Sequence, residues 1–359
     1  MAKKPYICNN NQATSHNNSP THMSSIIHHK SNVKAVITTV ICILLMSAFP
    51  RHAQAQERHN MLHRLDSLLS IRYMRADIDT HYIMRPPTKW TIRGRLNVSG
   101  AKIMAEGVND GHRLASELKA DYKKTLSMGV SYMGIALNFA LNPAKLLGRY
   151  NDYELNINSY GKRFGFDVIY QNAHNFTGWE DVQGQERIEL PANLLKLQTL
   201  NINAFHTFNH RRFSYPAAFT QSYIQRRSAG SLLLALSAQG QKGTLKYNYQ
   251  SFFKMTNIGI GAGYGYNYVP APGWLFHLSA LPTFIVYSKT SLTVDDNHIP
   301  LRYHFPEVII TGRGAIVHQR GNIFYGISGV FNFTNIGDEN SLTVRNTKWR
   351  SRAFLGFRL

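Results

Sequence analysis

The sequence predicts an all-β protein: an antiparallel transmembrane β-barrel of about 12 strands, preceded by a short N-terminal amphipathic helix. Three observations carry this prediction. An export signal lies near the N-terminus, apolar residues alternate with a period of two from Trp90 onward, and the last predicted strand ends on an apolar residue, Leu359. Segments of roughly ten residues, apolar on one face and polar or small on the other, are what a membrane barrel requires.

Residues 1–55 predict a secretory signal peptide. Residues 1–34 carry only positive charge, the stretch Ala35–Phe49 is apolar, and Ala53 and Ala55 offer small residues at the two positions that a signal peptidase reads. The apolar stretch is shorter than the roughly 20 residues of a spanning helix. We therefore expect cleavage near Ala55. Both cysteines lie upstream of that site, so the mature chain has no disulfide and no cysteine metal site.

The next segment predicts a lead-in to the barrel. Over residues 57–75, Met61, Leu65 and Leu69 fall on one face at helical spacing, which is typical of a short amphipathic helix. We expect this helix to belong to a periplasmic lead-in that covers residues 56–85. The barrel then covers residues 86–359, the remainder of the chain.

The chain is strongly basic, with a formal net charge of +20. Such a charge often indicates nucleic-acid binding, but export argues against that partner. The acidic partners of an exported barrel are lipopolysaccharide phosphates, acidic glycans or anionic solutes. Outer-membrane lipid and the barrel-assembly machinery complete the expected partners. We expect no cofactor and no metal.

The strand pattern is clearest in the C-terminal half. In residues 258–268 large apolar residues alternate with glycine, and in residues 323–333 and 349–359 they alternate with polar or small residues. Strict alternation places one set of side chains on each face of a strand. Residues 194–208 shift phase near Leu200, which indicates a bulge.

A soluble β-sandwich or lipocalin-like barrel is the alternative fold. High aromatic content near strand ends, typical of an interfacial girdle, weighs against it, and so do strands longer than ten residues. The apolar face of Leu355, Phe357 and Leu359 also resembles the C-terminal signal by which outer-membrane barrels are recognised for assembly. That signal more often ends on Phe, so Leu359 is a departure from it.

Several arginines occupy strand positions that should face the lumen. An arginine at the bilayer midplane costs about 2–4 kcal/mol, so these side chains should point inward, as should Asp167. The predicted lumen arginines are Arg93, Arg95, Arg350, Arg352 and Arg358. The glycine row of residues 259–265 should share the lumen. It either accommodates large side chains from elsewhere or leaves an open channel.

Residues 206–230 break the strand pattern and predict either a loop or a helix folded into the barrel mouth. The segment contains Tyr215 and Tyr223. It also contains four arginines: Arg211, Arg212, Arg226 and Arg227. One possibility is that the four arginines surround the two tyrosines and bind a phosphate or a glycan acid. The other is that the segment is a solvated loop whose arginines contact lipopolysaccharide.

Two constellations could carry chemistry. His277 and Ser279 share one face of a predicted strand and resemble the H-x-S pair of outer-membrane lipid A deacylases. In those enzymes His would be the general base and Ser the nucleophile, with an acid orienting the imidazole. That resemblance implies an outward-facing pair, whereas the alternation turns this pair inward and no orienting acid can be named. Asp77, Asp79 and His81 could hold a divalent cation, but the pattern favours a polar strand or turn.

Four short motifs carry a family resemblance: Asp79–Ile83, Asn156–Phe166, Phe213–Phe219 and Gln225–Ser231. Together they resemble an uncharacterised domain-of-unknown-function family of outer-membrane β-barrels from Bacteroidetes, over about residues 77–359. The resemblance implies export and a barrel in the outer membrane of a Gram-negative cell. It implies no activity and no site residues.

The sequence therefore favours an outer-membrane barrel without enzymatic activity, either a porin-like channel or a structural barrel with a basic lumen. One alternative is a barrel enzyme that modifies envelope lipids through His277 and Ser279. Another is a soluble periplasmic β-domain. The enzyme is disfavoured because the sequence shows no complete set of nucleophile, base and orienting acid.

Overall fold

The computed structural model describes Ser67 and most of residues 77–359. The gaps within that range are residues 110–111, 134, 142–152, 175, 183–185, 247–249, 295–296, 301–302, 304 and 338–341. The chain divides into two units, Met1–Leu68 and Leu69–Leu359, and the second contains nearly all described residues. The predicted signal peptide lies outside the described residues, as does the helix over 57–75 apart from Ser67, so both stay predictions.

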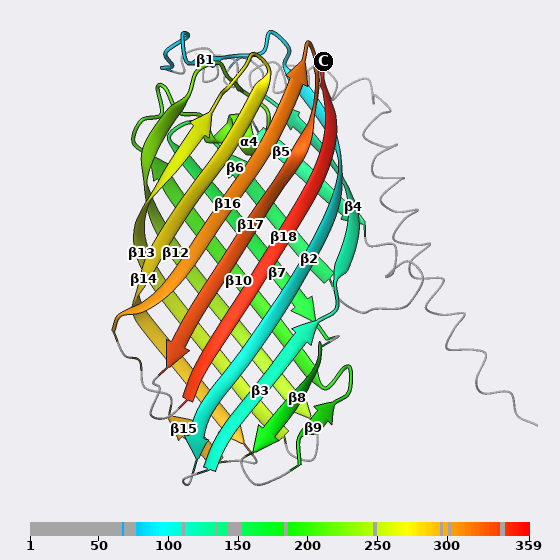
Figure 1. Ribbon diagram of the computed structural model, residues 1–359, viewed down its shortest axis with the longest axis vertical. Coiled ribbons are helices and arrows are strands. Elements are labelled where there is room, and N and C mark those ends of the chain that lie inside the picture. The colour runs from blue at the N-terminus through cyan, green and yellow to red at the C-terminus, as the bar shows by residue number, and fades with distance from the viewer. Residues whose placement is uncertain are drawn as a thin grey trace, which may run out of the picture. The chain divides into compact units, whose positions relative to one another are not determined.

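Strands make up nearly all of the second unit, with one short helix (Figure 1). Their bounds are β1 (Ile83–Met84), β2 (Trp90–Asn109), β3 (His112–Ala120), β4 (Lys123–Tyr132), β5 (Ile135–Leu141), β6 (Tyr153–Tyr160), β7 (Phe164–Ala173), β8 (Phe176–Val182), β9 (Ile188–Leu190), β10 (Leu195–Thr207), α4 (Tyr215–Phe219), β11 (Ile224–Gln225), β12 (Ala229–Lys246), β13 (Gln250–Tyr268), β14 (Trp274–Val294), β15 (Asn297–Pro300), β16 (Glu307–Arg320), β17 (Ile323–Gly337) and β18 (Leu342–Arg358). Among the described residues, no helix is long and apolar enough to cross a membrane.

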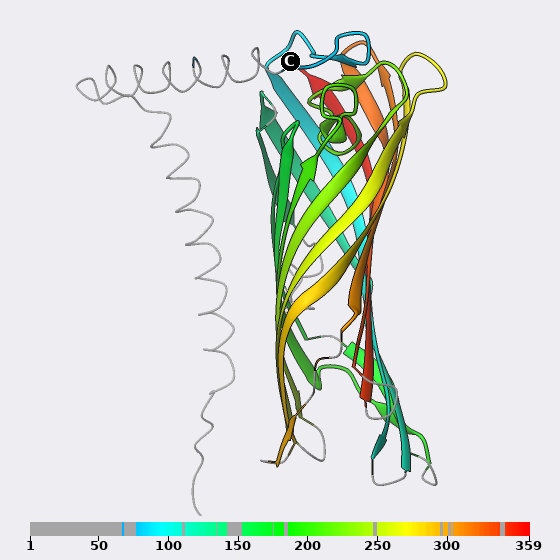
Figure 2. The ribbon, with the colours of Figure 1, turned by 90° about the vertical axis from the view of Figure 1, so that its left-hand side faces the viewer.

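One antiparallel sheet of 16 strands curls into a barrel (Figures 1 and 2). Twelve of these strands follow one hydrogen-bonded path: β5, β4, β2, β18, β17, β16, β14, β13, β12, β10, β7 and β6. The two ends of the path, β5 and β6, lie side by side. The all-β barrel prediction is confirmed, and the twelve strands of the wall agree with the predicted number. The other four, β3, β8, β9 and β15, extend the wall at the end far from the C-terminus.

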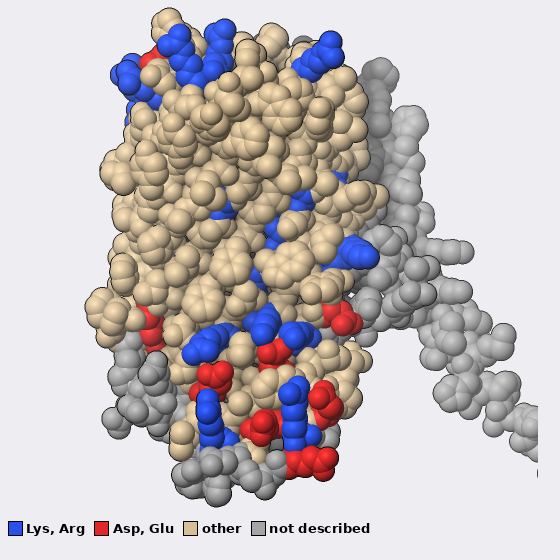
Figure 3. Space-filling view, in the orientation of Figure 1, with Lys and Arg blue, Asp and Glu red and all other residues tan. Residues whose placement is uncertain are grey.

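Alternating burial defines the two faces of the wall. Along β12, Leu232, Leu234 and Leu236 are exposed, whereas Ser231 and Leu233 are buried. Across the barrel the outward set is dominated by large apolar side chains, and Figure 3 shows a broad band with few charges between two charged ends. Lysine and arginine gather at the end that carries α4, and charges of both signs gather at the far end. An apolar belt of this kind is what a barrel wall presents to lipid.

The bulge predicted near Leu200 is wrong. Strand β10 keeps continuous register with β7 and β12, and the irregularity of the sheet lies instead between Ile258 and Gly259 in β13. The sequence misleads here because Leu195 and Leu197 face inward. They pack in a small apolar cluster with Phe176, so the inward set is apolar at this depth.

Inward glycines accommodate inward aromatic rings. A Cβ added at Gly265 would lie 3.0 Å from Cζ of Phe213, and one added at Gly165 would overlap the ring of Phe205. Gly265 belongs to the glycine row of β13, and Phe213 comes from the long connection between β10 and β12. At this point the glycine row accommodates a large side chain from elsewhere, which is the first of its two predicted roles.

Candidate functional site

Residues 208–228, which connect β10 to β12, fold into the barrel mouth and are called the plug here (Figure 2). The plug contains α4, all five residues of which are buried. Ser214 caps the helix by accepting a hydrogen bond from the Ala217 amide at 3.2 Å, and Pro216 stands in the first turn, where its missing N–H is not needed. The predicted irregular segment is thus a helix folded into the mouth and not only a loop.

A strap formed by residues 77–85 crosses the plug on its outer side. Strands β1 and β11 pair as a two-stranded sheet, and the Arg226 amide donates to the Tyr82 carbonyl at 2.7 Å. Ile83 of the strap is 1% exposed and joins the apolar core of the plug. The strap therefore holds the plug from outside the barrel.

The acids of the strap pair with arginines of the plug. Arg211 lies 3.2 Å from Asp77, and Arg212 lies 3.3 Å from Asp79. Among the residues that the structure describes, no three His, Cys, Asp or Glu side chains group as metal ligands. Asp77 and Asp79 thus take part in ion pairs at the exposed rim of the mouth.

Two inward arginines hold the C-terminal end of α4. Nη1 of Arg93 donates to the carbonyl of Thr220 at 2.5 Å and to Oε1 of Gln221 at 3.2 Å. Nε of Arg358 donates to the Gln221 carbonyl at 3.1 Å. The last carbonyls of a helix have no partner inside the helix, so these two cations of β2 and β18 satisfy groups that would otherwise be buried without a donor.

Ser279, His277 and Asn267 form a buried chain of hydrogen bonds on β13 and β14. Nε2 of His277 lies 3.0 Å from Oγ of Ser279, and Nδ1 lies 2.7 Å from Oδ1 of Asn267. Nδ2 of Asn267 donates to the Ser214 carbonyl at 2.9 Å, so its oxygen is the acceptor for the imidazole N–H. Nε2 then accepts from the Ser279 hydroxyl. Asn267 takes the orienting position for which the sequence names no acid.

The same chain continues into the plug and across the lumen. The Tyr215 hydroxyl lies 3.1 Å from Oγ of Ser279 and accepts from Nη1 of Arg313 at 3.3 Å. Nη2 of Arg313 donates to Asp167 at 2.7 Å, and Tyr160 donates to the same carboxylate at 2.5 Å. Strands β7, β13, β14 and β16 are thereby connected through a plug tyrosine.

The plug covers the Ser–His pair. His277 and Ser279 are each 4% exposed, and the rings of Phe213 and Phe219 lie 5.9 and 5.0 Å from the imidazole. The pair faces the lumen, as the alternation predicts. In this arrangement the pair binds the plug to the wall, and no open face remains at the Ser279 hydroxyl where a substrate could stand.

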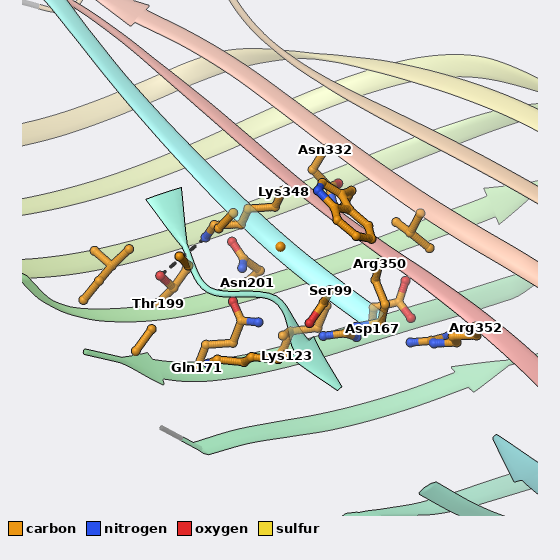
Figure 4. A pocket seen from close by; sticks show the side chains of 18 of the residues that line it. Ser99, Lys123, Asp167, Gln171, Thr199, Asn201, Asn332, Lys348, Arg350 and Arg352 are labelled. Carbon is orange, nitrogen blue, oxygen red and sulfur yellow. Dashed lines mark hydrogen bonds between the residues drawn. The ribbon is translucent and has the colours of Figure 1, made fainter. Parts of the chain in front are cut away.

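A basic cavity lies in the lumen beyond the plug (Figure 4). Its volume is about 100 Å³. Side chains from β2, β4, β7, β10, β17 and β18 converge on it. Its cations are Lys123, Arg313, Lys348, Arg350 and Arg352, and its acids are Asp121 and Asp167. Because Asp167 is paired with Arg313, positive charge is left in excess.

The predicted lumen arginines take three positions. Arg93 and Arg358 contact the plug, Arg350 and Arg352 line the cavity, and Arg95 is 7% exposed on the inward face of β2.

The four loop arginines do not surround the two plug tyrosines. Arg211, Arg212, Arg226 and Arg227 are exposed at the rim of the mouth, whereas Tyr215 and Tyr223 are buried beneath them. The sequence thus correctly predicts that the four arginines belong to the segment at the barrel mouth. It does not indicate that the arginines point to the surface while the tyrosines point into the barrel.

Sequence reasoning missed several residues of the site, among them Asn267, Arg313 and Lys348. Arg313 and Lys348 occupy inward positions of β16 and β18, so extending the alternation argument to those positions would have found them. Asn267 stands opposite His277 in the register of β13 and β14, and only that register reveals its role.

Two titratable side chains outside the strands have shifted pKa values. Burial, assisted by the charge of Arg85, lowers the pKa of Lys162 to about 8. Burial lowers the pKa of His210 below its ordinary value. Nε2 of His210 accepts a hydrogen bond from Nε of Arg163 at 2.9 Å, which requires a neutral imidazole.

Fold and site together define a β-barrel with a plugged mouth and a basic lumen. The chain belongs to the family described as a domain of unknown function, DUF4421, which matches residues 77–359. That description names no organism, so an origin in Bacteroidetes stays a prediction. Among curated proteins, no sequence matches this chain.

Solved structures give several similar barrels. The outer membrane protease OmpT from Escherichia coli is 8% identical, with 78% of this chain and 100% of that chain covered and a TM-score of 0.42. The outer membrane protein OprG from Pseudomonas aeruginosa is 12% identical, with 77% and 97% covered and a TM-score of 0.28. The toluene transporter TodX from P. putida is 7% identical, with 76% and 91% covered and a TM-score of 0.25.

Proposed function

We propose that the protein is an outer-membrane β-barrel that admits anionic solutes through a basic lumen, with the plug closing its periplasmic mouth. The observation that carries the proposal is the excess of cations in the cavity. Lys348, Arg350 and Arg352 lie at successive inward positions of one strand. Clustered cations of this kind raise the local concentration of anions.

The outer face supports the membrane location. Exposed leucines, isoleucines and aromatic residues cover the band between the charged ends, and this surface would be unfavourable in water. A gel of the membrane fraction, boiled and unboiled in SDS, tests the location. A heat-dependent shift in migration is expected. Release of the protein by salt, with no shift, would support the soluble periplasmic alternative.

Turn lengths support the orientation. At the plug end the connections at residues 133–134, 161–163, 269–273 and 321–322 are short, apart from the plug itself. The far end has short connections at 247–249 and 338–341 and longer ones at 142–152 and 295–306. Outer-membrane barrels have short periplasmic turns and longer extracellular loops. In this orientation the loop arginines face the periplasm. Lipopolysaccharide would then contact the charged side chains at the far end of the barrel.

Solute selectivity tests the transport function. In liposomes, the plug-loosened variant Arg93→Met should admit a small organic anion faster than a cation of equal size. Arg350→Gln combined with Arg352→Gln should reduce that preference, and Arg187→Gln at the exposed Arg187–Glu189 pair is the matched control. Equal permeation of anion and cation would contradict the proposal. So would zero permeation in both the wild type and a variant with a loosened plug, Arg93→Met.

A serine hydrolase is the second candidate, favoured by the geometry of Ser279, His277 and Asn267. Ser279 would attack an acyl carbonyl of an envelope lipid while His277 takes its proton and returns it to the leaving group, and water would then release the acid. This chemistry requires that Tyr215 withdraw from Ser279. Covalent labelling by a fluorophosphonate probe is expected in the wild type and absent in Ser279→Ala. No labelling of the wild type or of a plug-loosened variant contradicts this candidate.

A further inference from the structure

Neutral amide side chains form a belt around the lumen next to the cations. The amide belt consists of Asn201, Asn203, Gln239, Asn332 and Asn346, from β10, β12, β17 and β18. The belt lines a second space of about 50 Å³. This space shares Asn201, Asn203, Asn332 and Lys348 with the basic cavity. Amides and cations therefore face one continuous region of the lumen.

Several polar atoms of the belt have no partner among the described residues. Oε1 of Gln239 and Oδ1 of Asn346 are buried and accept no hydrogen bond there, although their side chains are 8% and 9% exposed. Buried polar groups are normally satisfied, so each such atom requires a water or a ligand group. These two acceptors call for a ligand or solvent that brings O–H or N–H donors.

Other belt amides have their carbonyl oxygens occupied. Ser237 donates to Oδ1 of Asn203 at 2.8 Å, and Thr311 donates to Oδ1 of Asn332 at 2.9 Å. The amide nitrogens of Asn203 and Asn332 then remain as donors toward the cavity. The belt thus offers acceptors and donors together, which matches the hydroxyl groups of a sugar because each hydroxyl can both donate and accept.

The cations beside the belt are open to an acidic group. Arg352 makes no hydrogen bond and no ion pair with the residues that the structure describes, and Nζ of Lys348 has one long contact, 3.5 Å from Oγ1 of Thr199. Lys348 and Arg352 stand four residues apart on β18, so each can bind a separate carboxylate of a ligand that spans the cavity. Figure 4 shows Lys348, Asn201 and Thr199 together on one side of the cavity, with Arg350 and Arg352 beyond them.

We infer that the lumen binds an acidic saccharide, with one carboxylate on Lys348, a second carboxylate on Arg352 and its hydroxyl groups on the amide belt. This inference rests on the proposed entry of anions into the lumen and narrows their chemical class. A small inorganic anion would use the cations alone and leave the belt unsatisfied. A long-chain fatty acid would need an apolar tube, and Asn201, Asn332 and Asn346 stand where its chain would lie.

Calorimetry on the purified full-length protein in detergent tests the inference. The probes are trigalacturonate, the neutral galactose trimer and acetate, which separate the acid from the hydroxyl groups. Trigalacturonate should bind at least about ten-fold more tightly than either other probe, since it alone meets both sets of side chains. Arg352→Gln combined with Lys348→Gln should lower its affinity to that of the neutral trimer. Asn346→Val and Gln239→Leu should lower its affinity while acetate binding stays unchanged.

The remaining outcomes distinguish failure of the saccharide inference from failure of the proposed function. Equal binding of trigalacturonate and acetate would refute the saccharide inference and leave anion entry standing. Equal binding of trigalacturonate and the neutral trimer would refute the role of the cations and with it the proposed function. Binding of none of the three would refute both. Arg187→Gln, at the exposed Arg187–Glu189 pair, is the control for affinity. A heat-dependent gel shift of every variant confirms that its barrel is folded.

Discussion

Arg93 donates a 2.5 Å hydrogen bond to the carbonyl of Thr220, 127 positions further along the chain. The first long strand of the barrel thus holds the residue that ends the plug helix. Arg93 is fully buried, so its charge is not solvated by bulk water and depends on such acceptors. Arg93 needs hydrogen-bond acceptors, and the carbonyls at the C-terminal end of α4 need donors. Each satisfies the other, which helps to hold the plug in the mouth.

Replacing Arg93 by Met should therefore loosen the plug while leaving the wall intact. Hydrogen bonds to charged groups contribute roughly 1.5–3 kcal/mol, and the variant leaves the Thr220 carbonyl without its donor. We expect faster cleavage of the plug by trypsin at the rim arginines, together with a preserved heat-dependent gel shift. Arg187→Gln, at a surface pair, is the control. Unchanged cleavage in Arg93→Met would show that the apolar core of the plug holds it alone.

The fit of Phe213 against Gly265 gives a second prediction. Leucine at position 265 would overlap the ring of Phe213, and overpacking of this kind costs typically about 1–3 kcal/mol. Gly265→Leu should lower the free energy of unfolding in urea, and adding Phe213→Ala should restore part of it by opening space. Gly240→Leu, where an added Cβ meets nothing within 4 Å, is the matched control. Equal effects of the Gly265 and Gly240 substitutions would contradict this packing argument.

Alternation predicts the strands and, once the export signal places them in a membrane, the direction of their charged side chains. The strands that contain Arg93, Arg352 and Arg358 have one apolar face, and these arginines lie on the opposite face. Because the apolar face contacts lipid, the guanidinium groups must point into the lumen. The same argument turns His277 inward. These predictions depend on local sequence and on one external fact, the apolar solvent on the outer side of the wall.

The plug and the hydrogen-bonded chain depend on contacts that no local pattern encodes. Tyr215 reaches Ser279 over 64 positions, and Arg313 reaches Asp167 over 146. Which loop enters the lumen is decided by the space that inward glycines leave, and the partner of an inward cation is decided by the curl of the sheet. Asn267 illustrates this, because only the register of β13 and β14 makes it the partner of His277.

The buried pair Arg313–Asp167 gives a third prediction. Both side chains are 7% exposed and their charged atoms lie 2.7 Å apart. Removing one partner of such a pair costs about 3–5 kcal/mol because the other charge stays buried without compensation. Asp167→Leu should destabilise the barrel by that amount in urea unfolding, and the double variant Asp167→Leu/Arg313→Met should recover most of the loss. A double variant no more stable than the single one would show that Tyr160 and Tyr215 need these charges as partners.

The turn at His210 gives a prediction for pH. Burial lowers the pKa of His210 below its ordinary value of 6.5, and its Nε2 accepts from Arg163 only when the ring is neutral. Between the lowered pKa and 6.5 the unfolded chain binds more protons than the folded one, so stability rises with pH in that window. The contribution is complete above pH 6.5 and is lost as the pH falls below it.

His210→Gln separates this effect from other titrations, because glutamine retains an oxygen that can accept from Arg163 and does not titrate in this range. The midpoint of heat unfolding, followed by the gel shift, should fall for the wild type as the pH is lowered from 7 to 5. The variant should show a smaller fall, and the difference between the two curves should be confined to pH values below 6.5. His210 is partly exposed, so solvent screening makes the expected difference small. Identical curves for the two proteins would mean that the Arg163–His210 hydrogen bond does not stabilise the mouth.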